Sequence, residues 1–213
     1  MKHLRRTLFL LLCVPLLAHG QVLRLAQQQT GATKVMAAPG DTITVEVMAD
    51  VGVQTASGLR FFVKVPRDDF IILETTGQQL KRTAPSPPFK QGRLFEGAVE
   101  IRNDMLSASD PTMVDKNWQM MEYAALLGPA PERGRSGSGV VAIFRVVCPP
   151  SPVSGSIAIH QDPIHETRLF MADGVTEKSF FIGSPLSIHV KIASAVQSTG
   201  WAEAKLQRSG SEF

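Results

Sequence analysis

The sequence predicts an all-β protein in which two sheets pack face to face. Short segments rich in β-branched and aromatic residues recur along the chain, turn residues bound most of them, and no long amphipathic helical pattern separates them. Parallel α/β architectures need crossover helices between their strands, so the sequence argues against that class. Eight or nine such strands can bury their apolar faces against each other as a sandwich.

The clearest strands show period-two alternation or a continuous apolar run. Residues 42–47 (TITVEV) alternate polar and apolar side chains after a Pro-Gly-Asp turn, which is typical of a half-buried strand. Residues 140–147 (VVAIFRVV) are almost wholly apolar, which predicts a central strand or burial on both faces. Further strands are expected at 59–65, 70–76, 156–159 and 186–192.

Other segments are less regular. Shorter strands are expected at 93–95 and 99–102, and residues 119–126 (QMMEYAAL) favour helix by propensity but are assigned to a strand because their neighbours are strands. The proline-rich stretch 81–90 is expected to run extended over the surface, and 103–118 is expected to be a long polar loop.

The first twenty residues have the three parts of a secretory signal. A basic start with Lys2, Arg5 and Arg6 precedes an apolar run at 8–17, and small residues then favour cleavage after Gly20. A membrane-spanning helix needs about 20 apolar residues, so this run is too short to serve as an anchor. We therefore expect a signal peptide at 1–20, one domain at 21–192 and a flexible tail at 193–213, in a protein that is secreted or held at the cell surface.

Removal of the signal changes the charge and the cysteine content. Residues 1–20 hold three of the 22 basic residues and none of the 19 acidic ones, so the mature chain is formally neutral. Nucleic-acid binding requires a concentrated basic face, and that class is disfavoured. Cys148 is then the single cysteine, which excludes an intramolecular disulfide, and its place after an apolar strand predicts an inert, partly buried thiol.

One segment gathers potential metal ligands. His160, Asp162, His165 and Glu166 lie within HQDPIHE, and such groups could hold a transition metal. The histidines lack helical i, i+4 spacing and Pro163 lies between them, so a solvated loop is the preferred interpretation. No nucleophile elbow, phosphate loop or dinucleotide fingerprint occurs, and we predict neither an enzyme nor a cofactor.

The order of several segments resembles that of bacterial cohesin domains. The segment PGDTITVEV is similar to that family's opening Gly-Asp strand, and the later SGSGVVAIFRVV is similar to its strand that begins with G-x-G. Ala172-Asp173-Gly174 is similar to its acidic turn. Where the family has a Tyr-Asp-Pro corner, this chain has VPRDD at 65–69. The resemblance covers residues 22–192, with segments 39–47, 58–65, 70–76, 136–147 and 172–174.

The resemblance implies a nine-stranded jelly roll that binds a calcium-loaded dockerin on one sheet face, with the metal in the dockerin and no cofactor in this chain. Glu74, Arg93 and Glu122 are expected on strands with outward side chains and are the candidate binding residues, although ordinary solvated charges would look the same. A carbohydrate-binding module is the alternative. It would require a row of exposed aromatic residues, for which the mature chain offers Trp118, Trp201 and Tyr123 besides phenylalanine. The expected partner is therefore a dockerin-like extracellular protein or a polysaccharide.

Overall fold

The computed structural model describes residues 20–67, 69–78, 87–107, 110, 112, 117–128 and 134–192. The signal peptide expected at 1–20 lies outside the described residues except for Gly20, and so does the expected tail 193–213. Parts of the stretches 81–90 and 103–118 also lie outside them. The described part of the chain contains no helix that is long and apolar enough to cross a membrane.

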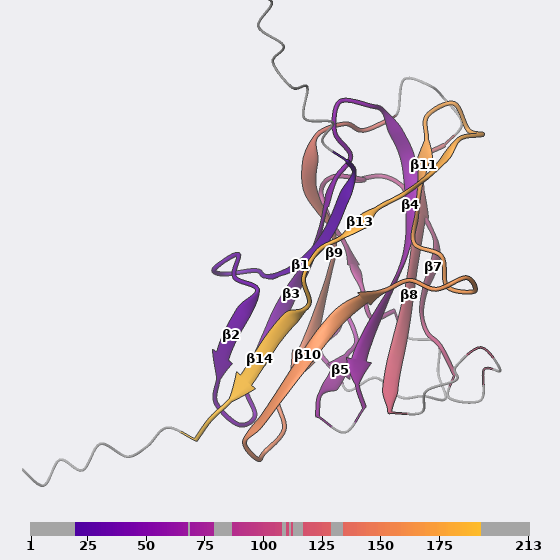
Figure 1. Ribbon diagram of the computed structural model, residues 1–213. Helices are drawn as coiled ribbons and strands as arrows, with labels where there is room; N and C mark the ends of the chain where they lie inside the picture. Colours follow the sequence, from indigo (N-terminus) through magenta and orange to yellow (C-terminus); the bar gives the residue numbers. More distant parts are fainter. Residues whose placement is uncertain are drawn as a thin grey trace, which may run out of the picture.

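The described residues form strands in two sheets (Figure 1). The six-stranded sheet has the order β13 (Phe181–Ile182), β1 (Val22–Gln27), β3 (Thr42–Asp50), β9 (Ser138–Val147) and β5 (Ile71–Leu73), with β6 (Lys90–Gln91) also on β9. The eight-stranded sheet has the order β12 (Glu177–Ser179), β11 (Arg168–Met171), β4 (Ala56–Pro66), β10 (Val153–His160), β14 (Leu186–Val190) and β2 (Lys34–Ala37). The edge of β4 that is not paired with β10 and β11 pairs with β8 (Trp118–Leu126), and β8 pairs in turn with β7 (Val99–Met105).

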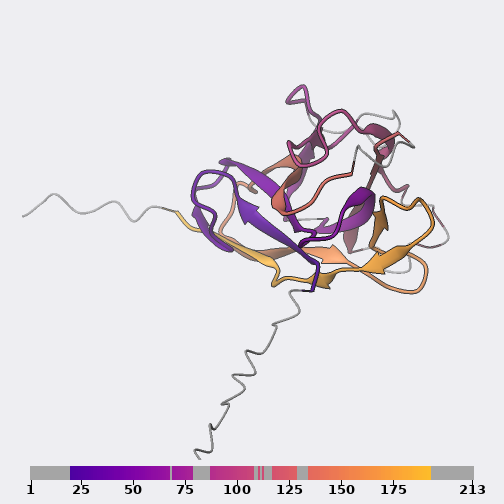
Figure 2. The same ribbon diagram turned by 90° about the horizontal axis from the view of Figure 1, so that it is seen from above.

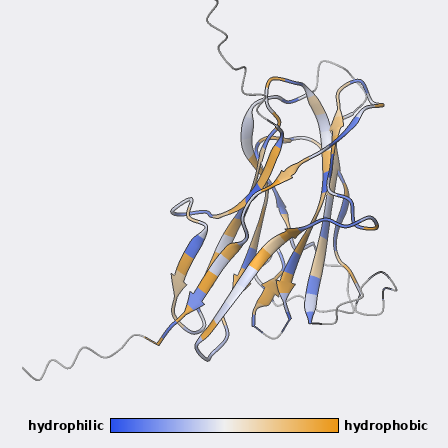
Figure 3. Cartoon of the chain, in the orientation of Figure 1, coloured by the Kyte–Doolittle hydropathy of each residue, from blue (hydrophilic) through white to orange (hydrophobic). Residues whose placement is uncertain are grey.

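The predicted all-β sandwich is confirmed. Seen from above, the strands lie in two layers (Figure 2), and hydrophilic and hydrophobic colours follow one another along the strands (Figure 3). The residues of β3 alternate in burial as expected, with Ile43, Val45 and Val47 buried and Thr44 and Glu46 half-buried. The ambiguous segment 119–126 is a strand that pairs with β4 over its whole length. Tertiary pairing thus overrides its helical propensity.

The strand assignments need two kinds of correction. Residues 93–95 form a turn instead of a strand, and the strand expected at 70–76 is limited to β5. The short strands β1, β2, β6, β11, β12 and β13 were not predicted. Most of these are too short to show a periodic pattern, and β2 and β13 are fixed by parallel pairing with distant segments.

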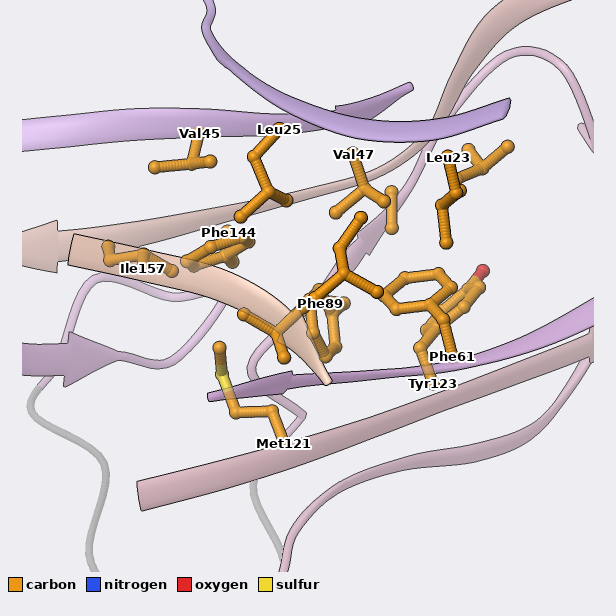
Figure 4. Close-up of a cluster of buried hydrophobic side chains, with 14 of the residues drawn as sticks. Leu23, Leu25, Val45, Val47, Phe61, Phe89, Met121, Tyr123, Phe144 and Ile157 are labelled. Carbon is orange, nitrogen blue, oxygen red and sulfur yellow. The ribbon is translucent and has the colours of Figure 1, made fainter. Parts of the chain in front are cut away.

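An aromatic cluster lies in the middle of the core between the sheets (Figure 4). The Phe89 ring is 5.5 Å from each of the rings of Phe61, Tyr123 and Phe144, with interplanar angles of 66–83°. Such edge-to-face contacts add to the stabilisation that burial alone supplies. The stretch 81–90 was expected on the surface, and this prediction is wrong for Phe89, which is only 1% exposed.

Cys148 lies directly after β9 and is buried, as predicted. Burial, together with the smaller effect of the nearby Asp41 carboxylate, raises the pKa of its thiol to about 11. The thiol therefore stays protonated and unreactive near neutral pH.

Candidate functional site

Strands β7, β8 and β4 lie side by side in the eight-stranded sheet, with β10 and β11 along the other edge of β4 (Figure 1). Leu59, Phe61 and Val63 of β4 point into the core, so the residues between them point outward. We call this surface the outer face. It consists of the outward residues of β4, β7, β8, β10 and β11.

The register aligns outward residues of similar chemistry in rows across the strands. Arg168, Arg60 and Arg102 belong to a basic row that also contains Ala124. The neighbouring row on one side carries acidic groups, and the row on the other side is apolar. The acidic row is His160, Phe62, Glu122 and Asp104, and the apolar row is Phe170, Gly58, Leu126 and Val99.

An ion pair lies at the centre of the outer face. Arg60 Nε donates to Glu122 Oε1 at 2.7 Å, and the Arg60 guanidinium lies over the ring of Phe62 at 4.8 Å. The Glu122 side chain is 9% exposed and that of Arg60 is 40% exposed. Phe62 and Met120 pack with Leu106 in a small apolar cluster separate from the main core, so the chain after β7 covers part of this face.

A shallow hollow of about 590 Å³ lies at one end of the eight-stranded sheet, where β4 ends and β8 begins. The half-exposed Trp118 lies beside it, with the Lys64 ammonium 4.8 Å from its ring. The remaining lining is mostly of polar residues, which include Asp69, Ser154, Ser187 and His189. This combination of one aromatic ring and several hydrogen-bonding groups could bind a polar ligand.

The HQDPIHE segment forms the connection between β10 and β11, and the prediction of a solvated loop is wrong for His165, which is only 4% exposed. His160, Asp162 and His165 converge, whereas Glu166 pairs instead with Arg168 at 2.6 Å. The pKa of Asp162 is held far below its ordinary value, chiefly by the backbone N–H and side chain of His165. The carboxylate is therefore ionised wherever the protein is folded near neutral pH.

The candidate residues Glu74, Arg93 and Glu122 do not share one face. Glu74 follows β5 in a turn in which Gly77 has a φ of +94°, and the exposed Arg93 lies in the turn between β6 and β7. Neither lies on a strand, which corrects that expectation. Glu122 is on β8 in the other sheet and faces outward, but its side chain is almost covered by its neighbours.

Sequence reasoning missed Arg60, Arg102 and Lys64, which give the outer face much of its charge. The alternation within 59–65 and 119–126 does indicate which side chains share a side of each strand. It carries no information on which strands are neighbours, and pairing of β4 with β8, β10 and β11 is what creates the rows.

Comparison with solved structures identifies the architecture. A type II cohesin from Bacteroides cellulosolvens superposes with a TM-score of 0.60 at 15% identity, covering 80% of this chain and 99% of the cohesin. The fold is that of a cohesin domain. A type II cohesin from the Acetivibrio cellulolyticus cellulosome matches with a TM-score of 0.58 at 15% identity over 79% of this chain and 95% of that one. The cohesin-like jelly roll expected from the sequence is thereby confirmed.

A third similar structure is a type II cohesin–X-dockerin complex from Acetivibrio cellulolyticus, with a TM-score of 0.60 at 13% identity over 80% of this chain and 99% of that one. Comparison of the sequence with protein-family models and with curated proteins gives no match. The likeness therefore lies in the arrangement of the strands.

Proposed function

We propose that this protein is a secreted, non-catalytic docking module that binds a dockerin-type extracellular protein on the outer face. The observation that carries the proposal is the alignment of a basic, an acidic and an apolar row on one rigid sheet with a cohesin fold. Secretion rests on the signal-like residues 1–20.

The outer face has the physical properties of a docking surface. Protein interfaces combine a few apolar or aromatic anchors with a surrounding polar rim. Val99 and Leu126 supply an exposed apolar edge at 66% and 38% exposure, and Arg102 lies beside them on β7. The backbone that carries these groups is fixed by sheet hydrogen bonds, so little backbone conformational entropy is lost when a partner binds.

A similar module binds a dockerin in the cohesin–X-dockerin structure, and that supports the choice of partner class. At 13% identity to that chain, we expect this module to present different side chains to its partner. We therefore expect this module to select its own partner through the charge rows rather than to accept dockerins of those cellulosomes.

The test is capture of proteins from the source organism's culture medium on the immobilised mature chain, with and without a calcium chelator. Binding of the captured partner is then measured for Arg102→Glu and Val99→Arg, with Lys90→Glu on the six-stranded sheet as the matched control. We expect the two outer-face variants to weaken binding at least about tenfold and the control to leave it unchanged. Equal weakening by Lys90→Glu, or no effect of the outer-face variants, would contradict the proposed surface.

A carbohydrate-binding module is the second candidate, and the hollow beside Trp118 is the observation that favours it. Aromatic rings stack on sugars while neighbouring polar groups bind the hydroxyls. Affinity electrophoresis through gels containing extracellular polysaccharides distinguishes the two functions. Retardation that is abolished by Trp118→Ala and unaffected by Arg102→Glu would favour the carbohydrate function over protein docking.

A further inference from the structure

Three potential metal ligands converge in the connection between β10 and β11. Their donor atoms lie within 4.8 Å of one another, and Asp162 Oδ2 is 2.7 Å from His160 Nε2 and 3.1 Å from His165 Nδ1. All three come from a stretch of six residues that begins at the end of β10. The two strands that flank this connection both pair with β4, so the cluster rests on the rigid part of the sheet.

The loop is shaped so that one oxygen of Asp162 remains directed at the imidazoles. Oδ1 accepts the backbone N–H groups of Ile164 at 2.8 Å and His165 at 2.7 Å, which fixes the orientation of the carboxylate. Thr167 Oγ1 donates to the carbonyl of His160 at 3.0 Å and closes the loop from the other end. The arrangement is therefore held by groups that are not themselves candidate ligands.

The ring of His165 is held from two sides. Its edge packs against Phe62, with ring centroids 5.1 Å apart at an interplanar angle of 74°. On the other side, Nε2 lies 3.0 Å from Thr112 Oγ1, which in turn lies 2.6 Å from Asp110 Oδ1. A side chain locked in this way loses little freedom when it binds an ion.

These hydrogen bonds decide which nitrogen of His165 has the free lone pair. The Thr112 hydroxyl has one proton, and the Asp110 carboxylate can only accept, so the hydroxyl donates to Asp110. Thr112 Oγ1 then accepts from Nε2–H of His165. A neutral His165 consequently has its lone pair on Nδ1, which faces Asp162 Oδ2.

A lone pair facing a carboxylate oxygen requires a positive charge between them, and either a proton or a metal ion supplies it. His160 Nε2 approaches the same oxygen at hydrogen-bond distance, so a single cation placed there would be shared by all three donors. Two imidazole nitrogens and one carboxylate oxygen form a typical ligand set for Zn²⁺ and similar transition ions. The chain from His165 through Thr112 to Asp110 is the kind of outer hydrogen bonding that accompanies metal-binding histidines.

Asp162 Oδ2 lies closer to each of the two imidazole nitrogens than two ligands of one metal ion would lie to each other. Ligands on a tetrahedral Zn²⁺ with bonds of about 2.0–2.1 Å lie about 3.3–3.4 Å apart. The observed 2.7 and 3.1 Å require small outward shifts. His160 can make such a shift, because its side chain is 21% exposed while that of His165 is 5% exposed.

We propose that His160 Nε2, Asp162 Oδ2 and His165 Nδ1 form a binding site for one divalent transition-metal ion of the Zn²⁺ class, with a fourth position open to water. The site belongs to this chain and is separate from any calcium that a dockerin would bring.

The test uses the mature chain without a histidine tag, treated with chelator and then dialysed. Titration with Zn²⁺ by isothermal calorimetry is expected to give one ion per chain, and titration with Co²⁺ is expected to give the visible absorption bands of a four-coordinate nitrogen–oxygen site. Long-range ¹H–¹⁵N spectra of the imidazoles should show Nε2 of His165 protonated and Nδ1 shifted by the metal. No saturable binding of either ion would overturn the proposal.

His160→Gln removes one ligand at the more exposed end of the cluster and is expected to weaken Zn²⁺ binding at least about tenfold. Thr112→Val removes the hydrogen bond that orients His165 and is expected to weaken binding by a similar factor. Asp162→Asn should weaken it further. His189→Gln is the matched control, because His189 pairs with Ser154 on β10 and lies outside the cluster. Circular dichroism verifies that each variant is folded. Equal weakening by His189→Gln, or undiminished binding in His160→Gln, would show that the ion binds elsewhere and contradict the proposal.

Discussion

Replacement of Phe89 by alanine tests whether the proline-rich stretch contributes the centre of the core. The Phe89 ring is 1% exposed and touches three other aromatic rings at 5.5 Å. Truncation of a buried phenylalanine to alanine costs about 3–5 kcal/mol, through lost transfer free energy and the cavity that is left. We expect the upper part of this range, because Phe89 joins strands from both sheets and the rigid sheets cannot collapse into the space.

The assay is equilibrium unfolding of the mature chain in urea, with far-ultraviolet circular dichroism as the signal that reports the folded fraction. A loss of 3–5 kcal/mol corresponds to a fall in Tm of about 6–20 °C for a domain of this size. Phe181→Ala is the matched control, since Phe181 is 73% exposed, and it should change the free energy of unfolding by less than about 0.5 kcal/mol. A loss below about 1 kcal/mol for Phe89→Ala would refute the placement of this ring in the core.

Three further predictions concern the sheet and the buried thiol. Arg60→Met leaves the nearly covered Glu122 carboxylate without its partner and should lower the free energy of unfolding by about 1–3 kcal/mol in urea titrations. Gly58→Ala places a carbon 2.4 Å from the Ala125 carbonyl oxygen of β8 and should destabilise by about 1–3 kcal/mol in the same assay. The folded pKa of Cys148 is about 11, raised from 9.0, so its contribution to stability is full below pH 9 and is lost as the pH rises through 11. Urea titrations across that range should therefore show a smaller decline for Cys148→Ala than for the wild type.

Each of these predictions has a control or a contrary result. Lys64→Met is the control for Arg60→Met on the same face. The Lys64 ammonium lies over the Trp118 ring and has no carboxylate partner among the described contacts, so its loss should lower the free energy of unfolding less than Arg60→Met does. Gly139→Ala meets only Leu94, at 3.3 Å, and should cost less than Gly58→Ala. Equal pH profiles for the wild type and Cys148→Ala would mean that the thiol is not buried in the folded protein.

The sequence allows prediction of the strands that carry their own signal. Residues 42–47 alternate because one side of that strand faces the core, and 140–147 are apolar because β9 lies in the middle of its sheet. The family resemblance, which depends on the order of such segments, is confirmed at the level of fold. Short strands such as β6 and β12 have no periodic pattern to detect, and their formation depends on partners that are distant in the sequence.

The candidate sites are less predictable from the sequence, for the same reason. The segment HQDPIHE shows that ligand-type residues are close together in the chain, but its polar composition indicates a solvated loop. The structure buries His165 because Phe62 and Thr112, from two other parts of the chain, pack against its ring. Glu74 and Arg93 are grouped with Glu122 because all three are expected on strands with outward side chains, but the structure places Glu74 and Arg93 in turns and only Glu122 on a strand.

The sequence by itself determined the fold class, because the period-two burial of a sandwich is a local property of each strand. It also predicts, if residues 1–20 are removed, a formally neutral chain with a single thiol, since both properties depend only on composition. Only the tertiary structure decided that Phe89 fills the core, that three rows of side chains align on the outer face, and that His160, Asp162 and His165 converge. Those features arise from contacts between segments far apart in the chain, and the register of one strand against another is set by packing rather than by either strand alone.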